Sequence, residues 1–309
     1  MKCTVLLPVY GGGTALAEAI ESILRQDEAA FEFLIIDDHS PDGSADLVRR
    51  YAERDSRIRA ICHDRNLGLA PTLNEGLAAA RCDLVARMDQ DDIALPARLA
   101  AQVSFMDKNP DVVVAGSFVY HMGRTPKRDR LVTLPVMHED IVRELPKQNC
   151  IYHPSVIVRR NEILSLGGYR ASYKNAEDYD LWLRVSKVYR VANIPIPLLR
   201  YRFSTNGMSL GRKWQQALFA RMAVIAYLHP DWGHDEVERA AADELEQQGR
   251  GWFFEQVTRG TVRELMALGL WGDAWRVLSS FWRQMDRGRA WRLALELGPD
   301  LLLRRPRVR

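Results

Sequence analysis

The chain has 309 residues, of which 47% are hydrophobic and 27% are charged, as in a globular protein with a sizeable core. This length is enough for one large domain together with a smaller domain or a long appendix. The net charge of only +3 excludes a nucleic-acid binder that relies on the charge of the whole molecule.

The first 120 residues alternate between strand-like and helix-like segments that are joined by short links. We predict strands over 4–9, 31–36, 58–62, 84–88 and 112–119, and helices over 15–25, 44–54, 70–80 and 96–109. This alternation predicts an α/β fold, with a mostly parallel sheet flanked by helices through right-handed connections. Ligands bind such sheets beyond the carboxyl ends of the strands, and the polar clusters of this sequence lie there.

The regular alternation stops after residue 118. Residues 120–150 are polar and rich in loops, and they are followed by strands over 156–159 and 195–203 and a helix over 176–185. From residue 211 onward the pattern predicts only helices, over 215–228, 236–248, 252–268 and 272–285. We therefore expect a first domain of residues 1–210 and an all-α domain of residues 211–309.

Neither the cysteines nor the apolar runs indicate export or membrane insertion. The four cysteines lack CxxC spacing and nearby histidines, so we interpret them as reduced thiols of a cytoplasmic protein. The apolar run at the start of the chain is broken by Pro8 and is too short for a signal peptide. No run approaches the ~18 apolar residues of a membrane span. Any membrane contact, such as one at the inner face of the cell membrane, is therefore expected to be peripheral.

Three carboxylates follow the strand predicted over 84–88. Asp89 and Asp91 are separated by one residue, so both side chains lie on the same side of an extended backbone. Hard divalent cations prefer oxygen ligands, and Mg²⁺ is often held by one or two carboxylates plus substrate phosphates. A solvated acidic turn explains the spacing equally well, and Asp92 can be explained as the N-cap of the following helix.

Two further strand ends contain polar residues. Asp37 and Asp38 end the strand over 31–36, and they suit either turn chemistry or contact with a ring N–H or a ribose hydroxyl. Arg65 and Asn66 follow the next strand, where an arginine can pair with a phosphate or stack on a base.

The glycine run at 11–13 matches a dinucleotide-binding turn only in part. The G-x-G-x-x-G pattern requires a third glycine where this chain has Leu16, although the distance to Asp37 imitates the expected spacing. We interpret the glycines instead as a tight backbone turn over a ligand. A dehydrogenase is therefore the weakest of the enzyme classes considered.

Acidic residues also open the helix predicted over 176–185. Glu177, Asp178 and Asp180 suit the positive end of the helix dipole, and for Asp180 we accept that structural explanation. His153 is a lone histidine in a loop, which by itself is more often a satisfied structural residue than a ligand.

Together these segments resemble the ordered motif series of family 2 glycosyltransferases. The motifs are V-L-L-P-V-Y, I-I-D-D-H-S, R-N-L-G-L, N-E-G-L-A-A-A-R, A-R-M-D-Q-D-D with P-A-R-L, H-P-S, G-G-Y and A-E-D-Y-D-L-W-L-R. The resemblance covers residues 1–210 and implies a GT-A fold, which is Rossmann-like. It also implies a nucleotide-sugar donor, a divalent metal (Mn²⁺ or Mg²⁺) and inversion at the anomeric carbon.

For donor binding, the resemblance assigns roles to individual residues. Pro8 and Tyr10 match the first-strand motif that lines the nucleotide. Asp38 matches the acid that accepts a hydrogen bond from the base, and Asp37 lies beside it. The remaining donor-binding residues are Arg65 and Asn66, which match nucleotide contacts, and His153 of the H-P-S motif.

For metal binding and catalysis, the resemblance points to two acidic motifs. Asp91 is the primary metal ligand, and Asp89 faces the ribose and the metal. Asp178 matches the catalytic base, and Glu177 precedes it as in the family's Glu-Asp motif. As a general base, Asp178 would take the proton from the attacking acceptor hydroxyl.

Two departures from the family pattern bear on the reaction. Many relatives have a histidine three residues after the tyrosine of the Tyr-Arg motif, where this chain has Ser204, so contacts from that loop to the metal or diphosphate are in doubt. The QxxRW motif of processive synthases is absent as well. We therefore expect addition of a single sugar rather than polymer extrusion.

The expected function is a metal-dependent inverting transfer of one sugar from a nucleotide-sugar donor to a hydroxyl acceptor. A UDP- or dTDP-type donor is favoured because Asp38 suits a uracil or thymine imide, and the acceptor is a cell-envelope or exopolysaccharide glycan or a lipid-linked intermediate. A sugar-phosphate nucleotidyltransferase is an alternative, but no lysine lies near Gly11–Gly13. A non-catalytic sugar-nucleotide-binding protein is another, but it would have no use for a base.

The C-terminal helices offer two interpretations. Residues at helical spacing form one apolar face that either packs against neighbouring helices or lies in a membrane interface: Trp271, Trp275, Leu278, Trp282 and Met285. Residues 275–309 contain nine arginines and three acids, an excess that could meet phosphates or an anionic membrane surface.

Overall fold

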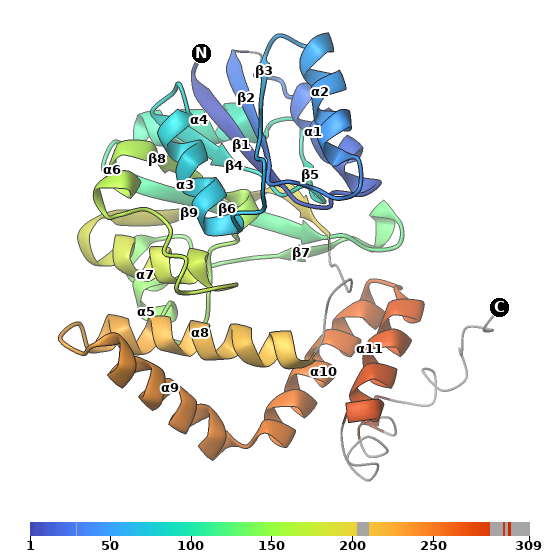
Figure 1. Ribbon diagram of the computed structural model, residues 1–309, viewed down its shortest axis with the longest axis vertical. Coiled ribbons are helices and arrows are strands. Elements are labelled where there is room, and N and C mark those ends of the chain that lie inside the picture. Colours follow the sequence, from blue (N-terminus) through green and yellow to red (C-terminus); the bar gives the residue numbers. More distant parts are fainter. Residues whose placement is uncertain (29, 203–209, 285–292, 294–295, 298–309) are drawn as a thin grey trace. The chain divides into compact units, whose positions relative to one another are not determined.

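The computed structural model describes residues 1–28, 30–202, 210–284, 293 and 296–297 (Figure 1). The chain divides into two compact units. The first comprises Met1–Tyr120 and Leu131–Arg202, and the second comprises His121–Arg130 and Phe203–Arg309. All the described residues to which the sequence assigns a role in donor binding or catalysis lie in the first unit.

The described strands form one mixed sheet. In chain order they are β1 (Cys3–Val9), β2 (Phe31–Asp37), β3 (Ile58–Cys62), β4 (Leu84–Arg87), β5 (Ile93–Ala94), β6 (Val112–His121), β7 (Arg130–Val132), β8 (Ile157–Arg159) and β9 (Arg190–Tyr201). Their spatial order is β3-β2-β1-β4-β8-β6-β9-β5, and β7 pairs with β6. Strands β1 to β4 are parallel, whereas β8 runs antiparallel to both β4 and β6. The predicted α/β fold is thus confirmed, with its parallel half at the N-terminus.

Helices cover both faces of the parallel half. They are α1 (Ala15–Leu24), α2 (Ser44–Arg54), α3 (Leu69–Ala79) and α4 (Arg98–Lys108). Val5 and Leu7 of β1 share one hydrophobic cluster with residues of α1, α2 and α4. The intervening Leu6 faces the other way, as the period of two in a strand requires, and packs so closely on Gly76 of α3 that no side chain fits there. This arrangement follows from right-handed connections in a sheet of order 3-2-1-4.

Pro8 fits a buried strand because of where β4 ends. Residues of a parallel strand offer their backbone groups to alternate neighbours, so Pro8 faces the same side as Leu6, whose carbonyl accepts the Met88 N–H. Pairing with β4 stops where Leu6 meets Arg87, so the missing N–H of proline costs no ladder bond there. The sheet opens at this point, and the chain after β4 leaves it to form the acidic loop.

The segment from 120 to 202 contains more regular structure than the sequence predicts. Besides β7, it forms α5 (His138–Glu144), α6 (Arg160–Ser165) and two short 3₁₀ turns, Pro126–Arg128 and His153–Ser155. The helix predicted over 176–185 is α7 (Glu177–Val188). The assignment of Asp92 as an N-cap is wrong, because α4 begins at Arg98 and Ala97 precedes it. Asp92 instead lies beside the two-residue strand β5, where it accepts a hydrogen bond from Arg202.

The second unit contains helices α8 (Leu210–Leu228), α9 (His234–Gln248), α10 (Arg250–Ala267) and α11 (Trp271–Gln284). Leu278 is fully buried, and Trp271 and Trp275 pack against the same cluster, so this part of the apolar face is a packing face. The side chain of Trp282, Met285 and the arginine-rich end lie outside the described residues. Among the helices that the structure describes, none combines the length and apolar character that crossing a lipid bilayer requires.

Residues 121–130 join this unit through a charged contact. Glu264 of α10 accepts a hydrogen bond from His121 at 2.8 Å and pairs with Arg130 at 2.6 Å. The N–H of Arg124 donates to the carbonyl of Leu268 at 2.9 Å. The turn between β6 and β7 is therefore fixed to the end of α10.

Candidate active site

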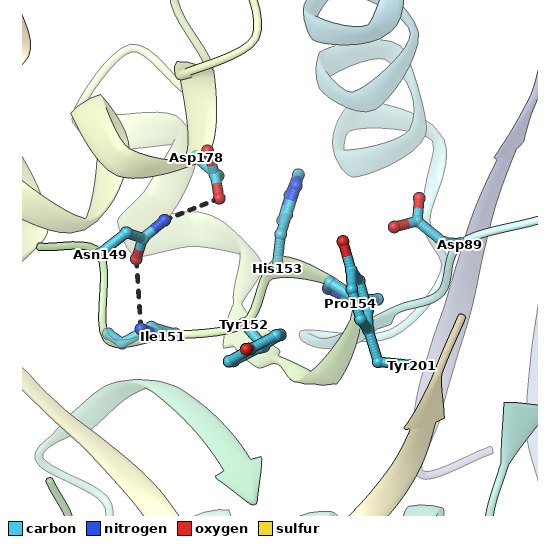
Figure 2. A pocket seen from close by; sticks show the side chains of 8 residues that line it. All are labelled: Asp89, Asn149, Ile151, Tyr152, His153, Pro154, Asp178 and Tyr201. Carbon is cyan, nitrogen blue, oxygen red and sulfur yellow. Dashed lines mark hydrogen bonds between the residues drawn. The ribbon is translucent and has the colours of Figure 1, made fainter. Parts of the chain in front are cut away.

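A cavity of about 230 Å³ lies at the carboxyl end of the sheet in the first unit. Eight residues line it: Asp89, Asn149, Ile151, Tyr152, His153, Pro154, Asp178 and Tyr201. Figure 2 shows Asp89 and Asp178 on either side of His153. The structure thus brings together three residues that lie in separate motifs of the sequence.

The acidic loop after β4 places three carboxylates together. One oxygen from each of Asp89, Asp91 and Asp92 lies within 4.8 Å of the others. Asp92 is buried, and its Oδ1 accepts the N–H of Arg202 at 2.7 Å, while its Oδ2 has no hydrogen-bond partner among the described residues. Burial and the nearby Asp89 raise the pKa of both Asp91 and Asp92. Oxygen donors that repel one another in this way fit a hard divalent cation.

Two arginines hold the acidic loop. Arg87 at the end of β4 pairs with Asp89 through an Nη2–Oδ1 distance of 2.5 Å. Arg202 at the end of β9 donates from Nε to the backbone carbonyl of Asp91 at 2.7 Å and pairs with Glu18 of α1 at 2.6 Å. The acidic loop is therefore held by Arg87 from the end of β4 and by Arg202 from the end of β9.

Gln90, the residue inside the Asp-x-Asp spacing, ties the acidic loop to the first loop. Its Oε1 accepts the N–H of Tyr10 at 2.8 Å, and its Nε2 donates to the carbonyl of Tyr10 at 3.0 Å. The ring of Tyr10 is half exposed beside this contact. The predicted nucleotide-binding and metal-binding loops are thus joined directly.

The glycines at 11–13 do not offer a free phosphate cradle. The N–H groups of Gly11, Gly12 and Gly13 donate to Ser40 Oγ, Ser44 Oγ and Asp42 Oδ2 respectively. Gly11 and Gly13 have φ values of +63° and +55°, which favour glycine, so the run forms the tight turn that we expected. Because its donors are engaged, this turn lacks the free N–H groups by which a dinucleotide-binding turn holds pyrophosphate.

Asp38 is buried and accepts several hydrogen bonds. His63 Nδ1 lies 2.7 Å from its Oδ1, which also accepts the N–H of Leu67, and its Oδ2 accepts the N–H of Gly68. A carboxylate has about four acceptor positions. Three of them are used here, so one remains for the ring N–H that the sequence assigns to Asp38. The neighbouring Asp37 accepts the N–H of Ser40 through Oδ2, and its Oδ1 has no partner among the described residues.

The loop after β3 is organised around the same acid. His63 Nε2 lies 2.8 Å from Glu75 Oε2, so the imidazole lies between two carboxylates. Burial disfavours its cation, but the hydrogen bonds with Asp38 and Glu75 raise the pKa of His63. Asn66 donates to the carbonyl of Asp38 at 3.2 Å, and Arg65 beside it is exposed.

The N-terminus of α7 presents the second acidic pair. Asp178 is half-buried, and its Oδ2 accepts a hydrogen bond from Asn149 at 3.0 Å. Burial raises the pKa of Asp178, while the Tyr179 N–H, Arg87 and Asn149 act in the opposite direction. Burial and the adjacent Asp178 raise the pKa of Glu177 to about 7.

His153 lines the cavity but is neutral. It is buried, its Nε2 lies 3.0 Å from Tyr169 Oη, and its ring contacts Trp182 edge to face. Burial and then the positive charge of Arg87 hold the pKa of His153 well below its usual range. An uncharged imidazole can offer a hydrogen bond to a ligand but cannot neutralise a diphosphate.

Asp180 has the structural role that we expected from the sequence, and Asn74 has a structural role as well. Asp180 is buried and pairs with Arg170 and with Arg184, whose guanidinium also donates to the carbonyl of Gly168. Asn74 exchanges two hydrogen bonds of 2.8 Å with the backbone of Tyr169. Both contacts hold the Gly-Gly-Tyr loop, from which the Tyr169 hydroxyl reaches His153 of the cavity wall.

Sequence reasoning missed several residues of the site. Asp92, Gln90 and Asn149 have no individual signal, because each acts through a partner that is distant in the sequence. Arg87 in A-R-M-D does stand out as a charge at the end of an apolar strand. Ser204, which replaces the histidine of many relatives, lies outside the described residues.

Comparison with known proteins identifies the family of the chain. The model of the family described as "Glycosyl transferase family 2" matches residues 4–167. The amylovoran biosynthesis glycosyltransferase AmsE of Erwinia amylovora is 32% identical over 200 residues, which cover 64% of this chain and 74% of that protein. The Escherichia coli UDP-Gal:alpha-D-GlcNAc-diphosphoundecaprenol beta-1,3-galactosyltransferase is 31% identical over 206 residues, covering 66% and 74%.

Solved structures share the fold at lower sequence identity. Staphylococcus aureus TarS 1–349 in complex with UDP-GlcNAc superposes with a TM-score of 0.61 and 16% identity, covering 97% of this chain and 90% of that one. The mannosyltransferase PcManGT of Pyrobaculum calidifontis, in complex with GDP-Man and Mn²⁺, gives a TM-score of 0.58 and 20% identity, covering 99% and 81%.

Proposed function

The chain belongs to glycosyl transferase family 2 and has a GT-A fold, and we propose that it moves one sugar from a nucleotide-sugar donor to a hydroxyl acceptor. The observation that carries this proposal is a single cavity lined both by Asp89 of the acidic loop and by Asp178 of α7. Such a cavity offers one side to a diphosphate and the other side to an attacking hydroxyl.

Asp178 is the proposed general base. It takes the proton of the acceptor hydroxyl while the hydroxyl oxygen bonds to the anomeric carbon. The bond between that carbon and the diphosphate oxygen breaks on the opposite face, so the configuration inverts and a nucleoside diphosphate leaves. General-base catalysis is typically worth ~10²–10⁴-fold in rate. The pKa of Glu177 is raised to about 7, so Glu177 changes its charge near neutral pH, and its proposed role is to adjust the charge beside the base.

Asp91 and Asp89 are the proposed ligands of a divalent metal, Mn²⁺ or Mg²⁺, with Asp92 beside them. When bound, such a cation supplies Lewis-acid stabilisation of the charge that grows on the leaving diphosphate. The protein supplies the rigid frame, because Arg87, Gln90 and Arg202 fix the acidic loop. PcManGT, which has the same fold, is solved with GDP-Man and Mn²⁺.

Asp38 is the proposed acceptor for the imide N–H of the base, with Asp37, Pro8 and Tyr10 around the nucleotide. The one acceptor position left on its carboxylate suits a uracil or thymine ring, so a UDP- or dTDP-type donor is favoured. One of the two relatives supports this choice, since its name specifies UDP-Gal. Arg65, Asn66 and His153 complete the proposed donor contacts.

The proposed acceptor is a cell-envelope or exopolysaccharide glycan, or a lipid-linked intermediate. The names of the relatives support this, since one belongs to amylovoran biosynthesis and another acts on a diphosphoundecaprenol-linked sugar. Contact with an anionic membrane would then be peripheral and would use the arginine-rich end beyond α11. Co-sedimentation with anionic liposomes, with and without residues 285–309, tests that contact, and equal binding argues against it.

A panel of nucleotide sugars with Mn²⁺ tests the function. We expect release of UDP or dTDP from one donor, slow with water and faster with the correct acceptor. D91N is expected to lose metal-dependent donor binding in calorimetry, whereas D178N is expected to bind the donor and lose turnover. Pyrophosphate release would instead indicate a nucleotidyltransferase, and a fully active D178N would remove the base assignment.

A further inference from the structure

Asn149 joins the proposed base to the backbone of the cavity wall (Figure 2). Its Nδ2 donates to Asp178 Oδ2 at 3.0 Å, and its Oδ1 accepts the N–H of Ile151 at 3.2 Å. The two ends of an amide are distinguished by their hydrogen-bond partners. Because the Ile151 N–H can only donate, Oδ1 must face it, and the donor end is fixed on Asp178.

Asn149 and Asp178 belong to different elements of the fold. Asn149 lies in the loop between α5 and the 3₁₀ turn His153–Ser155, whereas Asp178 lies in the first turn of α7. Asn149 is exposed, yet it lines the cavity beside Asp178. A side chain at the surface contributes little to folding stability, usually within about 0.5 kcal/mol. Its two well-formed hydrogen bonds therefore indicate a role at the cavity rather than in the core.

We propose that Asn149 is a positioning residue for the catalytic base: it occupies Asp178 Oδ2 and stabilises the carboxylate charge, so that Oδ1 takes the proton of the acceptor hydroxyl. This inference rests on the proposed function, in which Asp178 is the base. A carboxylate that is free to rotate presents either oxygen at varying angles, and a misplacement of about 1 Å can cost on the order of 10² in rate.

The surroundings of Asp178 show why a neutral donor suits this position. The groups that face it are Arg87 from β4, Glu177 and the Tyr179 N–H from α7, Tyr169 from the loop before α7, and Asn149. Burial raises the pKa of Asp178, and the hydrogen bond from Asn149 is one of the contacts that oppose this rise. An amide N–H donates a hydrogen bond to the carboxylate but does not transfer its proton to it, so Asp178 remains able to accept the proton of the substrate.

Two substitutions at this position separate geometry from charge. N149A removes the donor, so we expect kcat to fall roughly 10–100-fold with an unchanged KM for the donor. The acid limb of the kcat profile should move to higher pH. N149D places a second carboxylate beside the base, so its acid limb should move further in the same direction, because a like charge disfavours ionisation. N161A and N161D are matched controls, since Asn161 is also an exposed asparagine but lies on α6, away from the cavity-lining set.

Thermal unfolding of each variant accompanies the kinetics, and we expect both N149 variants to unfold at the wild-type temperature. A purely structural role would lower the unfolding temperature and leave the pH profile unmoved. If the wild type transfers sugar and N149A matches its kcat and acid limb, the inference about Asn149 is overturned while the proposed function stands. If the wild type releases no nucleoside diphosphate from any donor, the proposed function fails, and the inference fails with it.

Discussion

The guanidinium of Arg87 and the carboxylate of Asp89 form an ion pair between the end of β4 and the acidic loop, with an Nη2–Oδ1 distance of 2.5 Å. Arg87 is only 4% exposed, and its Nε and Nη1 have no hydrogen-bond partner among the described residues. A buried guanidinium therefore relies on this carboxylate for charge compensation, and the acidic cluster relies on Arg87.

We expect R87Q to lower the free energy of unfolding. Removing one partner of a fully buried ion pair costs about 3–5 kcal/mol, and because Asp89 is partly exposed we expect about 2 kcal/mol. Urea titrations of wild type, R87Q, D89N and the double variant form the measurement. The cycle should show a coupling of about 0.5–3 kcal/mol. Strictly additive effects would mean that the pair does not stabilise the fold.

Asp178 and Asp180, two residues apart on α7, should respond oppositely to replacement by asparagine. At neutral pH the ionised Asp178 is disfavoured by burial, as its raised pKa indicates, so D178N should unfold no earlier than wild type. D180N loses its pairing with Arg170 and Arg184, and because both arginines are partly exposed we expect a loss of about 2–3 kcal/mol. Differential scanning calorimetry checks this, and an early-unfolding D178N would contradict it.

Glu177 should add a second ionisation to the activity profile. Its pKa of about 7 is raised by burial and by the charge on Asp178, so Asp178 ionises first and Glu177 is still protonated while the base titrates. E177Q should therefore keep the acid limb of the wild type and lose the inflection near pH 7. Profiles of kcat from pH 5 to 9 with a saturating donor provide the measurement. A shift of the acid limb in E177Q would show that Glu177 is already ionised there.

His63 should stabilise the fold more at low pH than at high pH. Its folded pKa is raised above the unfolded value of about 6.5, chiefly by the hydrogen bonds with Asp38 and Glu75 that outweigh the cost of burial. The added stability is thus fully present below the unfolded pKa and disappears as the pH rises through the folded pKa. The difference in unfolding free energy between wild type and H63Q should shrink from pH 5.5 to pH 9, and a constant difference would argue against a charged His63.

The parallel half of the fold was predictable from the sequence because β1 and β2 are largely apolar runs buried on both faces, while the helices have a repeating apolar face. The apolar runs of β1 and β2 and the period of α2 identify their elements to within a residue or two. The antiparallel half was less predictable, since β5 has only two residues and β7 only three. These short strands form because they pair with the long strands β9 and β6, and the local sequence contains no pattern that predicts such pairing.

The candidate site was predictable only where a motif carries its own chemistry. The two acidic pairs, 89–91 and 177–178, follow from type and spacing together with the family resemblance. The residues that orient them do not. Gln90 and Asn149 act on partners that are 80 and 29 residues away, and the pairing of Arg87 with Asp89 depends on the shape of the loop between them. Asp92 is an instructive error, since its position before a helix suggested a cap, whereas the turn into β5 directs it inward to the N–H of Arg202.

The turn at 121–130 has a practical consequence for dividing the chain. Because His121 and Arg130 bind Glu264, the helical unit includes ten residues that the polypeptide supplies from between β6 and β7. A fragment that starts at residue 203 would leave the Glu264 carboxylate without His121 and Arg130, and the Leu268 carbonyl without its donor. A chimaera that receives the C-terminal helices of a homologous enzyme should therefore also receive the turn of that enzyme that corresponds to residues 121–130.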